Sequence, residues 1–149
     1  MFSLGPMRTL KLIVSSALLV AAAASAAAYC DSSPTVEQEF KTSALVFVGR
    51  VTSAREVRVR SQAVSGGTFY SVKVVQALKG STSKTVELYS ENGSGRFPMQ
   101  VSEQYLVFAD HGVFEGIRGR KLAINNCGNS APLAEAQKAL AVSHALTKA

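Results

Sequence analysis

The chain has 149 residues, of which 47% are apolar and 17% are charged, and its formal net charge is +6. These values exclude a large multidomain enzyme, a collagen and a disordered acidic segment. They combine two unlike parts, because residues 1–28 hold two of the 16 Lys and Arg residues and none of the 10 acids. The other 121 residues therefore carry a net charge of +4, and they are enough for one compact domain with a buried core.

Residues 1–28 have the three parts of a secretory signal peptide. Arg8 and Lys11 form a basic start, an uncharged apolar run follows, and the run ends in alanines. Cleavage after Ala28 would leave small residues where the signal peptidase needs them. The alternative is a membrane anchor, because the uncharged run approaches the ~20 residues that span a bilayer. We predict a cleaved signal peptide, a single mature domain over residues 29–149, and a secreted or periplasmic protein.

Two cysteines follow the predicted leader, Cys30 and Cys127. An even number of cysteines in a secreted chain favours pairing, because the compartment is oxidising. The pair would close a loop of about 100 residues and would stabilise the fold by at most about 4–5 kcal/mol. The alternatives are two free thiols or a metal pair, which would lack further histidine ligands nearby. We predict the disulfide.

A short helix begins the mature chain. Ser33 and Pro34 have the composition of a helix start, with a serine cap and a proline at the first helical position. In the segment 35–43, Val36 and Phe40 are four residues apart and form one apolar stripe.

Five β-rich segments follow, at residues 44–60, 69–78, 85–90, 105–109 and 122–125. Gly49 indicates a bulge or bend in the first of them. Ser65-Gly66-Gly67 indicates a turn, and a glycine-spaced loop is expected over residues 110–119. Residues 133–146 have helical spacing. The sequence therefore predicts an all-β fold with minor helix: a five-stranded, OB-fold-like antiparallel barrel with the N-terminal helical turn and the C-terminal helix packed on it.

Several segments also match a known family in their order and spacing. The first strand begins Ala44-Leu45-Val46-Phe47-Val48-Gly49-Arg50-Val51, and Val74-Val75-Gln76-Ala77-Leu78-Lys79-Gly80 follows it. Next come Phe97, Glu103-Gln104-Tyr105-Leu106-Val107-Phe108-Ala109, and Asn126-Cys127-Gly128-Asn129. With the cysteine after the leader, this series resembles the secreted bacterial relatives of the netrin-like (NTR) domain, the OB-fold module shared with tissue inhibitors of metalloproteinases. The resemblance covers about residues 30–139 and implies a non-catalytic module that contacts a protein, with a protease as one candidate.

The start of the mature chain departs from the inhibitor pattern. The inhibitors begin Cys-x-Cys, and the amino group and carbonyl of the first cysteine chelate the zinc of the protease. Here Tyr29 precedes Cys30, so inhibition by chelation requires cleavage directly before Cys30. The resemblance implies partner contact through the N-terminal edge, residues 29–34. The candidate contact residues are Tyr29, Cys30, Asp31, Ser32 and Ser33.

Catalytic and metal-binding patterns are absent from the sequence. His111 follows Asp110 directly, but no serine or cysteine stands in a nucleophile motif. The sequence contains no zinc or calcium ligand spacing and no phosphate-binding loop. We predict a protein that is not an enzyme, with no catalytic residue, metal or cofactor.

Cationic side chains concentrate at two places. One cluster is Arg55, Arg58 and Arg60, and the other is Arg118, Arg120 and Lys121. On an OB barrel these clusters would border the face that binds oligonucleotides or oligosaccharides, with Phe69, Tyr89 and Phe114 as available aromatic residues. The alternative is a solvated edge strand whose cations oppose aggregation. Our first hypothesis is protein contact through the N-terminal edge. The second is a polyanion-binding module for an anionic polysaccharide or surface or for nucleic acid, and the third is a true metalloproteinase inhibitor.

Overall fold

The computed structural model describes residues 30, 32–58 and 65–149. The predicted signal peptide, Tyr29, Asp31 and Arg60 lie outside the described residues. In chain order the elements are α1 (Val36–Thr42), β1 (Leu45–Arg58), β2 (Ser65–Lys79), β3 (Thr85–Glu91), β4 (Gln104–Gly112), β5 (Lys121–Ala123), β6 (Ala131–Pro132) and α2 (Gln137–Thr147).

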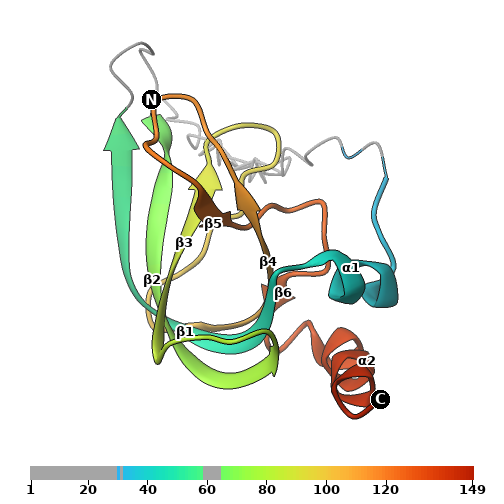
Figure 1. The fold of residues 1–149 in the computed structure, drawn as a ribbon. Coiled ribbons are helices and arrows are strands. Elements are labelled where there is room, and N and C mark those ends of the chain that lie inside the picture. Colours follow the sequence, from blue (N-terminus) through green and yellow to red (C-terminus); the bar gives the residue numbers. More distant parts are fainter. Residues whose placement is uncertain (1–29, 31, 59–64) are drawn as a thin grey trace, which may run out of the picture.

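Five of the strands form a closed ring within one sheet, and both helices lie on one side of it (Figure 1). β1 pairs antiparallel with β2 and with β4, β2 pairs antiparallel with β3, and β4 pairs antiparallel with β5. β3 and β5 meet through one parallel pair, Tyr89 with Ala123. The predicted all-β fold with minor helix is confirmed. We expected antiparallel pairing throughout, but β3 and β5 pair in parallel.

Gly49 lies where β1 changes register against β2, between Val48 and Gly49. A Cβ atom at this position would lie 2.5 Å from Val72 Cγ1 and 2.8 Å from Phe47 Cε2. The absence of a side chain therefore lets the strands and the Phe47 ring approach closely. Such irregularities bend a strand and increase its twist, which allows β1 to pair on both sides. The predicted irregularity at Gly49 is confirmed.

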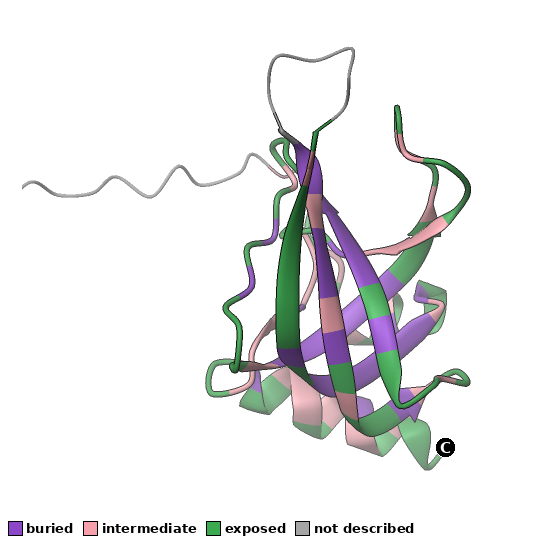
Figure 2. Cartoon of the chain, turned by 90° about the vertical axis from the view of Figure 1, so that its left-hand side faces the viewer, coloured by how far each residue is buried: buried purple, intermediate pink, exposed green. Residues whose placement is uncertain are grey.

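Two apolar clusters stabilise the ring, one inside it and one beneath the helices. Buried residues of the inner cluster include Phe47, Val72 and Val107, and no helix residue belongs to it. The outer cluster joins Val46 and Leu106 to side chains of both helices. Residues 45–49 of β1 and 105–109 of β4 are buried on both faces, which explains the continuous apolar runs there. In Figure 2, buried residues alternate with more exposed ones along the strands that no helix covers.

The start of α1 differs from the prediction. Thr35, rather than Ser33, is the N-cap residue, and its hydroxyl accepts a hydrogen bond of 3.2 Å from the backbone N–H of Gln38. The Gln38 side chain accepts one of 2.9 Å from the Thr35 N–H. This reciprocal capping box satisfies two free backbone donors, and it places Pro34 outside the helix.

Four further boundaries also differ. Ser65-Gly66-Gly67 is not a turn but the start of β2, and β4 continues to Gly112, into the predicted loop. Residues 131–132 form the unpredicted strand β6, which pairs with β4. α2 begins at Gln137 instead of residue 133. In the described part of the chain, no helix is both long and apolar enough to cross a bilayer.

Candidate functional site

The two predicted basic clusters meet at one aromatic ring. Arg55 on β1 is the cross-strand partner of Phe69 on β2, and its Cζ lies 5.1 Å from the centroid of the Phe69 ring. Lys121, the first residue of β5, places its Nζ 5.7 Å from the same centroid. Both distances are in the range of cation–π attraction. Successive side chains of a strand point to opposite faces of the sheet. Tyr70 belongs to the inner cluster, so the ring of its neighbour Phe69 lies on the outer face.

Phe69 belongs to a row of three aromatic rings. Its centroid lies 4.9 Å from that of Tyr89 on β3, and the Tyr89 centroid lies 4.7 Å from that of Phe114. Phe69 and Tyr89 are buried, whereas Phe114 is half-buried. Phe114 lies over Gly112, where a Cβ atom would be 2.7 Å from Phe114 Cζ. The row therefore fastens the loop 113–120 to β2 and β3.

The other described members of the two basic clusters lie at the same end of the ring. Arg58 is exposed at the end of β1, and Arg118 and Arg120 are exposed in the loop before β5. The end of β1 and this loop both lie at the top of the ring in Figures 1 and 2. We name the set Arg55, Arg58, Arg118, Arg120 and Lys121 the basic face. Glu56, Glu91 and Glu115 lie on β1, on β3 and on the same loop, so this region holds three acids and five cations.

Tyr89 anchors the centre of the aromatic row. Its hydroxyl donates a hydrogen bond to the carbonyl oxygen of Gly66. A Cβ atom at Gly67 would lie 2.5 Å from the Tyr89 hydroxyl oxygen. Gly67 thus makes room for the Tyr89 hydroxyl within β2, and Gly66 supplies the carbonyl that accepts its hydrogen bond. The predicted turn at this position is wrong. Burial raises the pKa of Tyr89, and the charge of Glu91 raises it further.

We expect the raised pKa of Tyr89, caused by burial and by the charge of Glu91, to make stability depend on alkaline pH. The unfolded chain releases the Tyr89 proton near pH ~10 and the folded chain at higher pH, so stability is full below about pH 10 and falls above it. Tyr89→Phe should cost about 0.5–1.5 kcal/mol at neutral pH, because the Gly66 carbonyl loses one of its two donors and keeps the Asn92 N–H at 3.3 Å. Its alkaline decline should be shallower, as denaturant unfolding at several pH values would measure. An unchanged decline in Tyr89→Phe would contradict the assignment.

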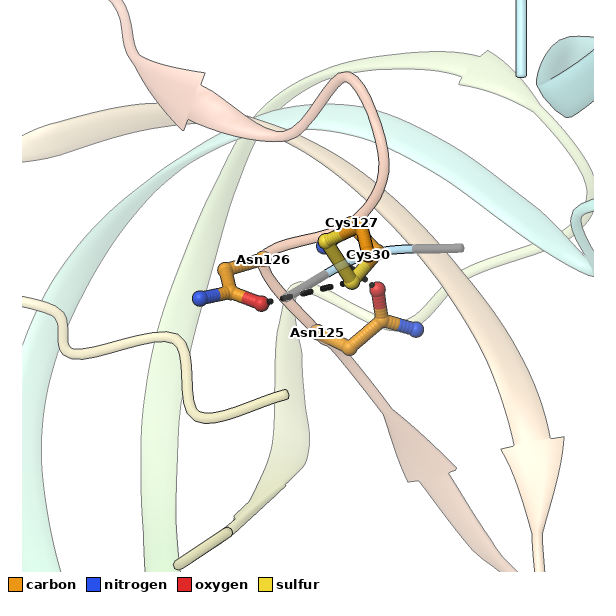
Figure 3. Close-up of a disulfide and its surroundings, with 4 residues drawn as sticks. All are labelled: Cys30, Asn125, Asn126 and Cys127. Atoms are coloured by element: carbon orange, nitrogen blue, oxygen red, sulfur yellow. Dashed lines mark hydrogen bonds between the residues drawn. A yellow bond between two sulfur atoms is a disulfide. The ribbon is translucent and has the colours of Figure 1, made fainter. Parts of the chain in front are cut away.

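At the N-terminal edge the predicted disulfide is confirmed. Cys30 and Cys127 are bonded, with their Cα atoms 5.5 Å apart, across a sequence separation of 97 (Figure 3). Asn125 accepts a 2.9 Å hydrogen bond from the Cys127 N–H through its side-chain oxygen. The Asn126 side-chain oxygen lies 3.6 Å from Cys127 Sγ, which carries no hydrogen in the disulfide, so this is a packing contact.

Asn129 holds the N-terminal edge a second time. Its side-chain NH2 donates to the Pro34 carbonyl oxygen at 3.1 Å and to Glu39 Oε2 at 2.7 Å. Its backbone N–H donates to the same carboxylate oxygen at 2.6 Å. A Cβ atom at Gly128 would overlap that carboxylate. Each residue of Cys127-Gly128-Asn129 therefore has a role in fixing the edge, and Glu39 is a contributor that sequence reasoning missed.

The structure describes three of the five predicted contact residues. Ser32 and Ser33 are exposed and Cys30 is half-buried, whereas Tyr29 and Asp31 lie outside the described residues. The fixed backbone beneath Ser32 and Ser33 gives this edge a defined shape.

Asp110 contacts its neighbour His111 through the backbone. The Asp110 carboxylate accepts a 2.7 Å hydrogen bond from the backbone N–H of its neighbour His111, which is exposed on β4. Cavities of about 300 Å³ and 310 Å³ both touch His111, and the second is also lined by Glu39 and Asp110. Over residues 30, 32–58 and 65–149, no group of three or more His, Cys, Asp or Glu side chains is placed to hold a metal ion.

No protein-family model matches the sequence, and no curated protein matches it either. The resemblance to the netrin-like family stays a prediction.

Proposed function

We propose that the protein is a secreted or periplasmic, non-catalytic binding module whose basic face binds polyanions. The observation that carries this proposal is the approach of Arg55 and Lys121, from two separate parts of the chain, to the ring of Phe69. OB-folds bind oligonucleotides and oligosaccharides on the face of strands 2 and 3, between the loops that join strands 1 and 2 and strands 4 and 5. The proposal is supported by the positions of Arg55 and Arg58 on β1 and of Arg118, Arg120 and Lys121 in or beside the segment that joins β4 to β5.

Electrostatics favours binding over a solvated edge. Arg55 Cζ lies 5.1 Å and Lys121 Nζ lies 5.7 Å from the same ring centroid. The two positive charges are therefore close to each other, and they repel. Attraction to the Phe69 ring offsets part of the repulsion, and a bound polyanion would remove it. Alternating cations that only oppose aggregation need no such convergence from β1 and β5. The Cys30–Cys127 disulfide is consistent with an oxidising compartment outside the cytoplasm.

Removing the two convergent charges tests the proposal. Arg55→Gln with Lys121→Gln should weaken binding to a sulfated polysaccharide about 10- to 100-fold. It should also reduce the dependence of log affinity on log salt by about two. The matched control is Lys84→Gln with Lys138→Gln, which removes two exposed charges from other parts of the surface. An equal loss in the control would show that only net charge matters and would contradict a defined site. Titrations at several salt concentrations measure both quantities.

The N-terminal edge supports a second candidate function, contact with a protein partner. The specific observation is that the disulfide and Asn129 hold the same short segment from two sides. A preformed edge loses little conformational freedom on binding. Metalloproteinase inhibition by chelation further requires a mature chain that starts at Cys30. N-terminal sequencing of the secreted protein decides this point, because a Tyr29 start removes the chelating mechanism.

A further inference from the structure

The described surface offers almost no aromatic ring to a ligand. The sequence contains no tryptophan, and eight of the nine aromatic side chains that the structure describes are buried. The ninth, Phe114, is half-buried against Tyr89 and Gly112. Apart from the imidazoles of His111 and His144, a partner that relies on stacking finds one partly exposed ring on the described part of the molecule, Phe114.

The rings beneath the basic face present little surface on which a ligand could stack. Phe69 is 8% exposed and Tyr89 is 1% exposed. The approach to Phe69 is already taken by Arg55 and Lys121. Proteins that bind single-stranded nucleic acid combine a positive groove with exposed rings, and each stacked base contributes about 1–3 kcal/mol. The basic face has the charges of such a site without its stacking surface.

We infer that the basic face recognises fixed anionic groups alone, and that its ligand is an acidic polysaccharide carrying sulfate or carboxylate groups. This inference rests on the proposed function and names the ligand class of the same site. The planar guanidinium of Arg55 suits two-point contact with a sulfate or carboxylate, whereas Lys121 acts as a compact charge. The buried rings serve to position these cations.

The role of the rings follows from their contacts. Phe69 lies under the two cations that come from β1 and β5. Tyr89 and Phe114 extend the row to the loop that carries Arg118 and Arg120. The row therefore links the positions of both basic clusters without presenting a face to the ligand. Phe69 and Phe114 are positioning residues in this arrangement.

The test compares polyanions that do and do not carry flat rings. The probes for the full disulfide-bonded protein are a heparin fragment, a polygalacturonate fragment, oligothymidylate, and an abasic deoxyribose-phosphate strand of the same length as the oligothymidylate. At equal ionic strength and equal numbers of charges, we expect a polysaccharide fragment to bind most tightly. The abasic strand should bind within about twofold of oligothymidylate, because no base stacks. Phe114→Leu should leave this ratio unchanged.

Two results would overturn the inference while sparing the proposed function. One is oligothymidylate binding about fivefold or more tightly than the abasic strand, the ratio that corresponds to about 1 kcal/mol of stacking. The other is oligothymidylate or the abasic strand binding more tightly than both polysaccharides. Failure of every probe to bind would overturn the proposed function as well, so the two failures are distinguishable.

Discussion

Replacing both cysteines, Cys30→Ser with Cys127→Ser, is expected to lower the free energy of unfolding by about 2–5 kcal/mol. The disulfide closes a loop of 97 residues, and these are the only two cysteines of the chain. Without the link, the unfolded chain gains conformational freedom that the folded chain does not share. Since small domains are stable by about 5–15 kcal/mol, the loss would be a large fraction of the total.

Denaturant unfolding of the oxidised protein and the double variant measures this difference. The matched control is Ser32→Ala with Ser33→Ala, which changes two exposed neighbours of Cys30 and should shift stability by less than about 0.5 kcal/mol. Polyanion binding should persist in the folded double variant, because the basic face lies on β1, β5 and the loop before β5. A stability loss below about 1 kcal/mol would indicate that the Asn129 contacts fix the edge without covalent help.

The second large effect is expected inside the ring, where Phe47→Ala should cost about 3–5 kcal/mol. Phe47 is 0% exposed and packs in the inner cluster. The strand that carries it is hydrogen-bonded on both sides, so the wall cannot easily collapse into the cavity. Val113→Ala, at a side chain that is 75% exposed, is the control and should have almost no effect. Thermal or denaturant unfolding measures both.

Gly49 provides an independent check on the same packing. Gly49→Ala should cost about 1–3 kcal/mol through overpacking, because its new methyl group meets the Phe47 ring and Val72. Combined with Phe47→Ala, the cost should be smaller than the sum of the two single costs by about 0.5–3 kcal/mol, since the ring that obstructs the methyl group is gone. Additive effects would show that Val72 or the backbone, rather than Phe47, sets the need for glycine.

Local composition predicted much of the fold. The β-branched and aromatic runs marked all five strands of the ring, since these residue types suit a pleated, packed surface. Two cysteines in a chain with a predicted leader allowed only one intramolecular pair. β6 was missed because two residues, one of them a proline, carry no periodic signal. Ser33 and Thr35 are both acceptable caps, and only the reciprocal bond with Gln38 distinguishes them.

The candidate site was harder to predict because it depends on contacts between distant segments. The sequence identified both basic clusters, but their meeting at Phe69 requires the ring to close through β3 and β5. Gly66 and Gly67 have the composition of a turn, yet their function is set by the Tyr89 side chain 23 residues away. Likewise, nothing near Glu39 in the sequence indicates that its carboxylate binds Asn129, 90 residues along the chain.

The pairing of β3 with β5 bears on how firmly the basic face is held together. A single residue pair and the 3.0 Å hydrogen bond from the Ile124 N–H to the Tyr89 carbonyl oxygen hold these two strands together. This is the weakest seam of the ring, and the side chains of Phe69, Tyr89 and Phe114 lie across it on the outside. The aromatic row therefore packs across this seam and also lies beneath the cations. A ligand that contacted both Arg55 and Lys121 would therefore span this seam as well.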